Sequence, residues 1–265
     1  MGNTPLIAAH RGSYSGNIPC NSESAFLAAL NQGADIIELD VSVTLDGRLF
    51  VFHPFKEHAF LRNPIPLRFL PSGLIKNKLF LNQDRVKTQE KILTLDDALE
   101  LLKGKCKINV DKFWTAPEKI ADTIRRHGMQ EQVFIKTHPK PRQIDAVEKY
   151  APDLPYFVMV WEKDEISDSL LKRNLRFAGI EALFTCDTQP IAQREYIDSM
   201  HKKGLMVWGN AIVYDYREVI SGGHNDTVAL RGDPEAGWGW FRDMGFDIVQ
   251  TDFVPSLVQY YQKGI

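Results

Sequence analysis

The chain has 265 residues, and its net charge of −2 provides no basic surface of the kind that binds nucleic acid. Its three cysteines (Cys20, Cys106 and Cys186) are scattered and odd in number, which predicts neither a disulfide framework nor a zinc site. No stretch approaches the roughly 20 apolar residues of a membrane-spanning helix, so no stable membrane insertion is expected.

Strand and helix patterns alternate along the chain. Strands are predicted, in chain order, at Leu6–His10, Asp35–Val43, Leu49–His53, Lys107–Asp111, Gln132–Thr137, Tyr156–Trp161, Gly179–Phe184, Leu205–Trp208 and Ile248–Asp252. Helices are predicted between them at Ser22–Gln32, Leu95–Leu102, Pro117–His127, Pro141–Tyr150, Asp164–Arg173 and Pro190–His201. Thr94 and Asp97 predict a capping box at the start of the second of these helices.

Repeating strand–helix units imply parallel strands, and barrels of this kind use about 250 residues. We therefore predict one domain over residues 1–265, an α/β fold of the (β/α)8 TIM barrel class. One of the nine strand candidates would then be a hairpin partner or an extension. An open doubly wound sheet is the alternative, but no glycine-rich phosphate loop follows the first strand.

Two carboxylates share one face of the second predicted strand. Because side chains alternate along a strand, Glu38 and Asp40 face one way and the apolar residues at 37, 39 and 41 face the other. Carboxylates placed side by side repel each other unless a proton or a metal lies between them. The alternative is a solvated edge strand in a hairpin, since Thr44–Gly47 predicts a turn and Leu49–His53 a following strand.

Several motifs surround this pair. His10-Arg11-Gly12 closes the first strand, and it is followed by Pro19 to Phe26, Gly33 to Val41, Thr44 to Gly47 and His53. In order and spacing these pieces resemble the signature of the glycerophosphodiester phosphodiesterase family: H-R-G, P-E-N-T-x-x-A-F, G-A-D-x-I-E-x-D-V, T-x-D-G and a strand ending in H-D. Gly245 to Asp252 resembles the family's last strand, so the resemblance covers nearly the whole chain, most firmly residues 6–53.

Two positions depart from the family pattern. Cys20 stands where the family usually has Glu, and Pro54 stands where it usually has Asp. The first departure affects how the loop after the first strand is braced, and the second affects the turn after His53.

The resemblance implies a divalent metal site. Glu38 and Asp40 offer hard oxygen ligands suited to Mg²⁺ or Ca²⁺, and Asp111 is the best third ligand. The family usually has Glu-x-Lys at this third position, so the register of Asn109 to Lys112 is open.

The resemblance also implies a pair of acid–base histidines, His10 and His53, because imidazole titrates near neutral pH. Arg11 would grip a phosphate oxygen, with a surface ion pair as the alternative. Asn21 would orient His10 or cap the following helix. Trp208 would wall the glycerol pocket, or else pack in the core.

Strand alternation separates two lysines. If Asp111 points into the barrel, Lys112 points outward and is peripheral, whereas Lys136 points inward and would contact the substrate phosphate. Farther along the chain, His224 and Asp226 could ligate a metal, but their spacing favours local turn hydrogen bonds.

Residues 54–91 interrupt the alternation of strands and helices. This segment holds eight basic residues against three acidic ones, and it is predicted to be an insertion that caps the barrel mouth and attracts an anionic phosphodiester. The alternative is a solvated loop with no steering role.

Together these features predict metal-dependent hydrolysis of glycerophosphodiesters to sn-glycerol 3-phosphate and an alcohol. The alternatives are a sphingomyelinase D-like phospholipase on the same barrel and a non-catalytic barrel that binds phosphodiesters. Met1–Thr4 is no signal peptide, which predicts a cytoplasmic location, or a periplasmic or secreted one if a leader has been removed. The sequence leaves open the alcohol, the preferred ion and the oligomeric state.

Overall fold

A computed structural model describes residues 4–213, 215 and 217–263. Met1–Asn3, which belong to the segment predicted not to be a signal peptide, lie outside the described residues. Within the described part of the chain, no helix is both long and apolar enough to span a membrane.

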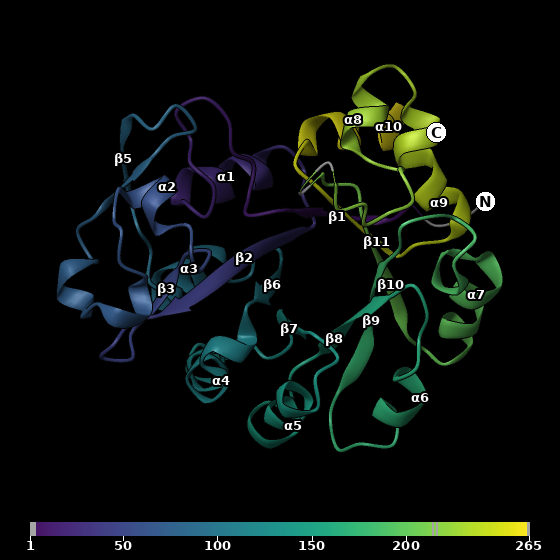
Figure 1. Cartoon of the computed structure of the whole chain (residues 1–265), viewed down its shortest axis with the longest axis horizontal. Helices are drawn as coiled ribbons and strands as arrows, with labels where there is room; N and C mark the ends of the chain where they lie inside the picture. Colours follow the sequence, from purple (N-terminus) through teal and green to yellow (C-terminus); the bar gives the residue numbers. More distant parts are fainter. Residues whose placement is uncertain (1–3, 214, 216, 264–265) are drawn as a thin grey trace.

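Eight parallel strands in this part of the chain form a closed barrel (Figure 1). They are β1 (Leu6–Ala9), β2 (Ile36–Val43), β6 (Lys107–Asp111), β7 (Val133–Thr137), β8 (Tyr156–Trp161), β9 (Phe177–Leu183), β10 (Met206–Asn210) and β11 (Ile248–Thr251). Each strand pairs with the next in this order, and β1 pairs with both β11 and β2, which closes the ring. The predicted (β/α)8 TIM barrel is confirmed.

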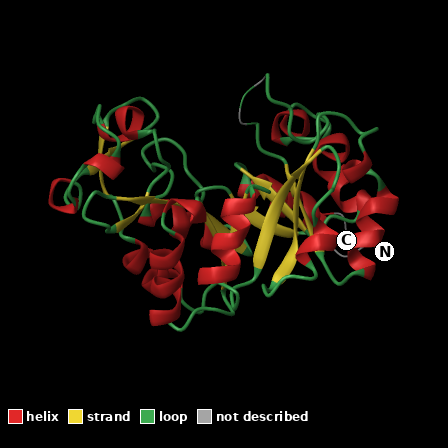
Figure 2. Ribbon diagram, turned by 60° about the horizontal axis from the view of Figure 1, so that its bottom comes forward, coloured by secondary structure: helices red, strands yellow, loops and turns green. Residues whose placement is uncertain are grey.

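Helices surround the barrel (Figures 1 and 2). They are α1 (Glu23–Asn31), α3 (Leu95–Leu102), α4 (Pro117–Arg126), α5 (Pro141–Tyr150), α6 (Ser167–Leu170), α7 (Arg194–Lys202), α8 (Asp226–Leu230), α9 (Trp240–Met244) and α10 (Val254–Lys263). The predicted capping box of Thr94 and Asp97 is present at the start of α3. The sequence prediction omitted α8, α9 and α10.

Two predicted helices are shorter than expected. The helix predicted at Asp164–Arg173 contains only Ser167–Leu170, because the Asp164 carboxylate accepts the backbone N–H groups of Ile166 and Ser167 in a turn that delays the helix. Pro190 opens a separate 3₁₀ turn, and α7 begins only at Arg194.

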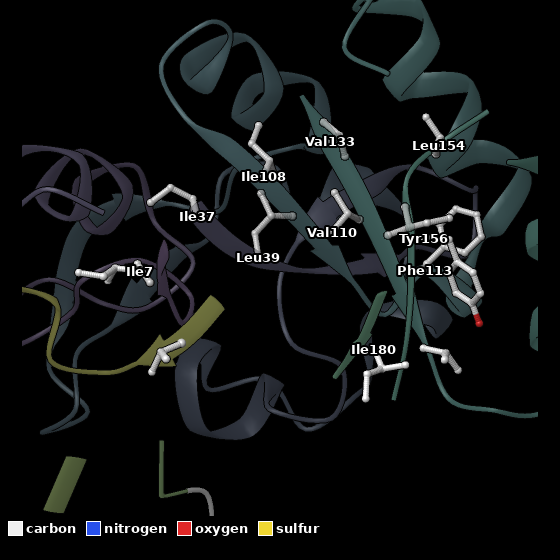
Figure 3. Close-up of a cluster of buried hydrophobic side chains, with 14 of the residues drawn as sticks. Ile7, Ile37, Leu39, Ile108, Val110, Phe113, Val133, Leu154, Tyr156 and Ile180 are labelled. Atoms are coloured by element: carbon white, nitrogen blue, oxygen red, sulfur yellow. The ribbon is translucent and has the colours of Figure 1, made fainter. Parts of the chain in front are cut away.

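The main apolar core lies between the barrel and its helices. Ile37 and Leu39 from β2 pack there with Ile108 and Val110 from β6 (Figure 3). Because side chains alternate along each strand, the residues between them point into the barrel. The barrel interior holds a second, smaller apolar cluster of Ala8, Ile36, Phe134, Phe157, Trp208 and Ile248.

The strand candidate that lies outside the barrel is Leu49–His53, and it is the predicted hairpin partner: β3 (Leu49–Val51) runs antiparallel to β2. After it, residues 54–91 form α2 (Glu57–Leu61), two 3₁₀ turns (Leu67–Phe69 and Ser72–Leu74) and a hairpin of β4 (Leu79–Leu81) and β5 (Lys87–Lys91). This segment packs with flanking residues in a separate apolar cluster, made of Phe50, Phe52, Leu61, Leu67, Leu70, Ile75, Phe80 and Ile92. Figures 1 and 2 show it beside the barrel strands, and its predicted role as a cap over the mouth stays a prediction.

Candidate active site

Three buried carboxylates meet where the middle of β2 lies beside the C-terminal end of β6. Asp40 and Asp111 are register partners on these neighbouring strands, and Glu38 lies two residues before Asp40 on the same face. One carboxylate oxygen from each residue lies within 4.8 Å of the others. The structure therefore brings together the three residues predicted to hold a metal.

The surroundings of Asp40 and Glu38 fit a hard divalent cation. Asp40 Oδ2 accepts a hydrogen bond of 2.9 Å from Asn21, but the buried Oδ1 has no hydrogen-bond partner among the described residues. Burial, and then the charge of Asp40, raises the pKa of Glu38 to about 7. A cation between these oxygens would relieve both the repulsion and the unpartnered acceptor.

Lys112 also enters this cluster, which overturns the prediction that it points outward. Its Nζ lies 2.6 Å from Asp111 Oδ2 and 3.7 Å from Asp40 Oδ1. The alternation of side chains no longer applies, because β6 ends at Asp111 and Lys112 adopts a left-handed backbone conformation with φ of 59°. Against the effect of burial, the charges of Asp111 and Asp40 raise the pKa of Lys112 above its ordinary value.

The turn after β1 places Arg11 and Asn21 against the carboxylates. The Arg11 backbone N–H donates to Glu38 Oε2 at 2.9 Å, and its Nε lies 2.9 Å from Asp40 Oδ2. Gly12 permits this turn, since its φ is 79° and a Cβ atom there would lie 2.7 Å from the carbonyl oxygen of Ala25.

Asn21 has neither of its predicted roles. Its amide nitrogen donates to Asp40 Oδ2, and its amide oxygen accepts the Asp40 backbone N–H at 3.2 Å. The side chain that caps α1 belongs to Ser22. Cys20, the departure from the family pattern in this turn, is buried, and burial raises the pKa of its thiol to about 12. It is therefore a neutral thiol at physiological pH.

The His10 imidazole is held through one ring nitrogen. Its Nδ1 lies 2.8 Å from Asp252 Oδ1, which also accepts a hydrogen bond from the Tyr14 hydroxyl. Burial raises the pKa of Asp252, but these hydrogen bonds outweigh it and leave the pKa below its ordinary value. The ionised carboxylate accepts only, so Nδ1 carries the proton and Nε2 is free for chemistry.

His53 is held in the same manner, by a backbone acceptor. Its Nδ1 donates to the Pro54 carbonyl oxygen at 2.8 Å, and its Nε2 lies 3.9 Å from Asp40 Oδ1. Burial lowers the pKa of His53, although the Asp40 charge opposes this shift. Because a backbone carbonyl makes the contact, the Pro54 departure leaves it intact.

The two histidines line one cavity of about 190 Å³ at the barrel mouth together with Glu38 and Asp111. Lys136 points into it from β7 as predicted, and its Nζ lies 3.0 Å from Glu181 Oε2. Trp208 is fully buried against Phe134 and Phe157. It therefore packs in the core, the second of its two predicted roles, and does not line the cavity.

Sequence reasoning gave no functional role to several residues near this mouth. His138 lines the cavity and contacts the Trp114 ring, and Tyr14 and Asp252 hold His10. His138 and Asp252 directly follow the ends of β7 and β11, so their position after barrel strands was an available signal. The side chains of His224 and Asp226 do not make the predicted local turn hydrogen bonds. His224 contacts the Ala236 carbonyl oxygen and the Asp187 carboxylate, and Asp226 accepts hydrogen bonds from Trp238 and Thr251.

The sequence of the chain is similar to known proteins over parts of its length. Residues 156–261 match a family model described as a domain of unknown function. A glycerophosphodiester phosphodiesterase of Caldanaerobacter subterraneus is 30% identical over 164 residues, an alignment that spans 56% of this chain and 64% of that protein. The chain thus aligns with less than two thirds of that relative.

Solved structures resemble the chain over nearly its whole length. A glycerophosphoryl diester phosphodiesterase from Parabacteroides distasonis superposes with a TM-score of 0.79 at 20% identity, covering 100% of this chain and 88% of that one. A phosphodiesterase from Oleispira antarctica, in complex with the product sn-glycerol-3-phosphate, superposes with a TM-score of 0.71 at 18% identity and covers 98% and 97%. At these identities the structures establish the shared fold.

Proposed function

We propose that the chain is a metal-dependent glycerophosphodiester phosphodiesterase that releases sn-glycerol 3-phosphate and an alcohol. The observation that carries this proposal is the cluster of Glu38, Asp40 and Asp111 beside a cavity that is also lined by two imidazoles, each held through its Nδ1. The name of the curated relative and the product complex of the structural neighbour support it.

Glu38, Asp40 and Asp111 would hold one divalent cation, Mg²⁺ or Ca²⁺. When bound, this cation would neutralise negative charge on the phosphodiester. Arg11 lies against Asp40, so its remaining N–H groups can donate to a phosphate oxygen above the cluster. Lys112 brings a second positive charge to the same place.

His10 and His53 would divide the proton transfers. One imidazole Nε2 takes the proton from the attacking oxygen, and the other donates a proton to the oxygen of the departing alcohol. The Asp252 carboxylate stabilises His10 as it becomes charged, which suits His10 to accept the proton. The attacking oxygen is either the glycerol 2-hydroxyl, which gives a cyclic phosphate that water then opens, or water itself. The same two residues serve both routes.

The deciding experiment measures release of sn-glycerol 3-phosphate from glycerophosphocholine by the purified protein. We expect activity with Mg²⁺ or Ca²⁺, loss of activity in excess chelator, and loss in Glu38→Gln. Sphingomyelin and lysophosphatidylcholine are assayed in parallel. Cleavage of these lipids alone would favour the sphingomyelinase D-like alternative, and binding without turnover of any diester would favour the non-catalytic barrel.

A further inference from the structure

The cavity wall across the ring from the carboxylate cluster carries three buried hydrogen-bonding side chains. Glu181 on β9, Asn210 on β10 and Gln250 on β11 are 5%, 1% and 4% exposed, and all three line the mouth cavity. Figure 1 shows β9 and β10 across the barrel from β2 and β6. These residues lie outside the catalytic roles described above.

Their positions follow from the barrel layers. Asn210 and Gln250 are register partners, and each lies two residues after an interior apolar residue, Trp208 and Ile248 respectively. Because every second side chain on a strand points the same way, both amides point into the barrel directly above the apolar cluster. The two amides therefore form a polar layer next to the apolar cluster in the barrel interior.

Two acceptor atoms in this layer have no hydrogen-bond partner in the part of the chain that the structure describes. Asn210 Nδ2 donates to Glu181 Oε1 at 2.7 Å, and this contact fixes the amide orientation because a carboxylate can only accept. Asn210 Oδ1 is then left buried without a hydrogen-bond partner among the described residues, and so is Gln250 Oε1. Buried acceptors of this kind are normally paired, so they call for a ligand that donates hydrogen bonds.

The charge of the layer identifies the kind of donor. Glu181 Oε2 lies 3.0 Å from the Lys136 ammonium, so this carboxylate is already neutralised and offers no net charge to a cationic head group. Hydroxyl groups are neutral donors that suit the two amide oxygens. Met159, Leu183 and Ile212 complete this part of the cavity with apolar surface for a short carbon skeleton.

We propose that Asn210 and Gln250, braced by Glu181, bind the hydroxyl groups of the glycerol moiety and so select hydroxylated phosphodiesters. This inference rests on the proposed function, since it places the phosphate at the carboxylate cluster. The residues act in binding and selectivity, with no part in proton transfer.

The test compares two substrates on one variant. Gln250→Met keeps the length of the side chain and removes the acceptor. We expect the ratio of kcat/KM for glycerophosphocholine to kcat/KM for bis(p-nitrophenyl) phosphate, which has no hydroxyl, to fall by about tenfold, mainly through KM. Gln32→Met is the matched control, because Gln32 Oε1 is also buried without a partner but lies at the end of α1. Its ratio is expected to equal that of the wild type.

A binding measurement keeps the test independent of turnover. Calorimetry compares sn-glycerol 3-phosphate with methyl phosphate, and the preference for the former is expected to shrink by a similar factor in Gln250→Met. If circular dichroism shows that Gln250→Met is unfolded, Gln250→Asn replaces it in the test. That variant moves the same amide oxygen back by one methylene. An unchanged preference in the folded variant overturns the inference. A wild-type protein that cleaves bis(p-nitrophenyl) phosphate but not glycerophosphocholine overturns the proposed function instead.

Discussion

Lys112 competes directly with any cation that enters the carboxylate cluster. Its ammonium lies 2.6 Å from Asp111 Oδ2 and 3.7 Å from Asp40 Oδ1, both predicted metal ligands. We expect Lys112→Met to bind Ca²⁺ at least about tenfold more tightly, because the metal no longer displaces a buried ion pair. Calorimetric titration measures this affinity, and the exposed Lys105→Met is the control. Equal or weaker binding in Lys112→Met would contradict the competition.

Asp252 positions His10 and keeps its Nδ1 protonated. We expect Asp252→Asn to lower kcat by about 10² or more, because the amide neither fixes this tautomer nor stabilises a charged imidazole. Tyr14→Phe is the matched comparison, since it removes only the second hydrogen bond to the same oxygen and is expected to cost less than about tenfold. Steady-state kinetics with glycerophosphocholine separates these effects, and a near-normal kcat in Asp252→Asn would remove Asp252 from this role.

Asp226 links folding stability to pH. Burial raises its pKa from 3.8 to about 6, against the hydrogen bonds from Asp252, Thr251 and Trp238. The folded protein therefore holds this proton more tightly than the unfolded chain does. The resulting stabilisation is complete below pH 3.8 and is lost as the pH rises through about 6.

We therefore expect the stability advantage of the wild type over Asp226→Asn to shrink by up to about 3 kcal/mol between pH 4 and pH 7. Urea unfolding of both proteins across this range measures the difference, in which the effects of all other titrating groups cancel. A difference that stays constant or grows with pH would show that Asp226 remains ionised throughout the range.

At the scale of elements, the segment 54–91 depends on its own apolar cluster. Phe80 in β4 is 1% exposed within this cluster, whereas Phe69 on the same segment is 56% exposed. We expect Phe80→Ala to lower the free energy of unfolding by about 3–5 kcal/mol and Phe69→Ala by less than about 1 kcal/mol. Chemical denaturation measures both, and similar losses in the two variants would contradict the assigned packing.

Elements with strong local signals were predictable from the sequence. The alternation in β2 and β7 placed Glu38, Asp40 and Lys136 inside the barrel, and the resemblance supplied His10 and His53. The β4–β5 hairpin was missed because β5 reads Lys-Thr-Gln-Glu-Lys, without an apolar alternation. Lys112 was misplaced because a left-handed residue after a strand leaves no mark in the pattern of apolar residues.

For the whole molecule, we expect binding of the proposed metal ion to be coupled to folding stability. Three buried carboxylates repel one another in the metal-free protein, and a cation that binds only the folded state stabilises it. At a hundred times Kd this amounts to about 2.7 kcal/mol, which corresponds to a rise in Tm of about 5 °C. Differential scanning fluorimetry with and without Ca²⁺ or Mg²⁺ measures it. Glu38→Gln is expected to abolish the rise, and the exposed Glu100→Gln to retain it.

Because the apolar cluster around residues 54–91 is separate from the main core, we expect the molecule to exchange amide hydrogens as two units. We expect the amides of β4 and β5 to open to solvent without disturbing the barrel, because the barrel strands share a continuous core with the surrounding helices. Phe52 belongs to the apolar cluster around residues 54–91, and it directly precedes His53. Each such opening would loosen the support of the imidazole proposed to transfer protons, while the carboxylates stay fixed. If His53 has that role, we expect the active fraction of molecules to follow the local stability of this segment.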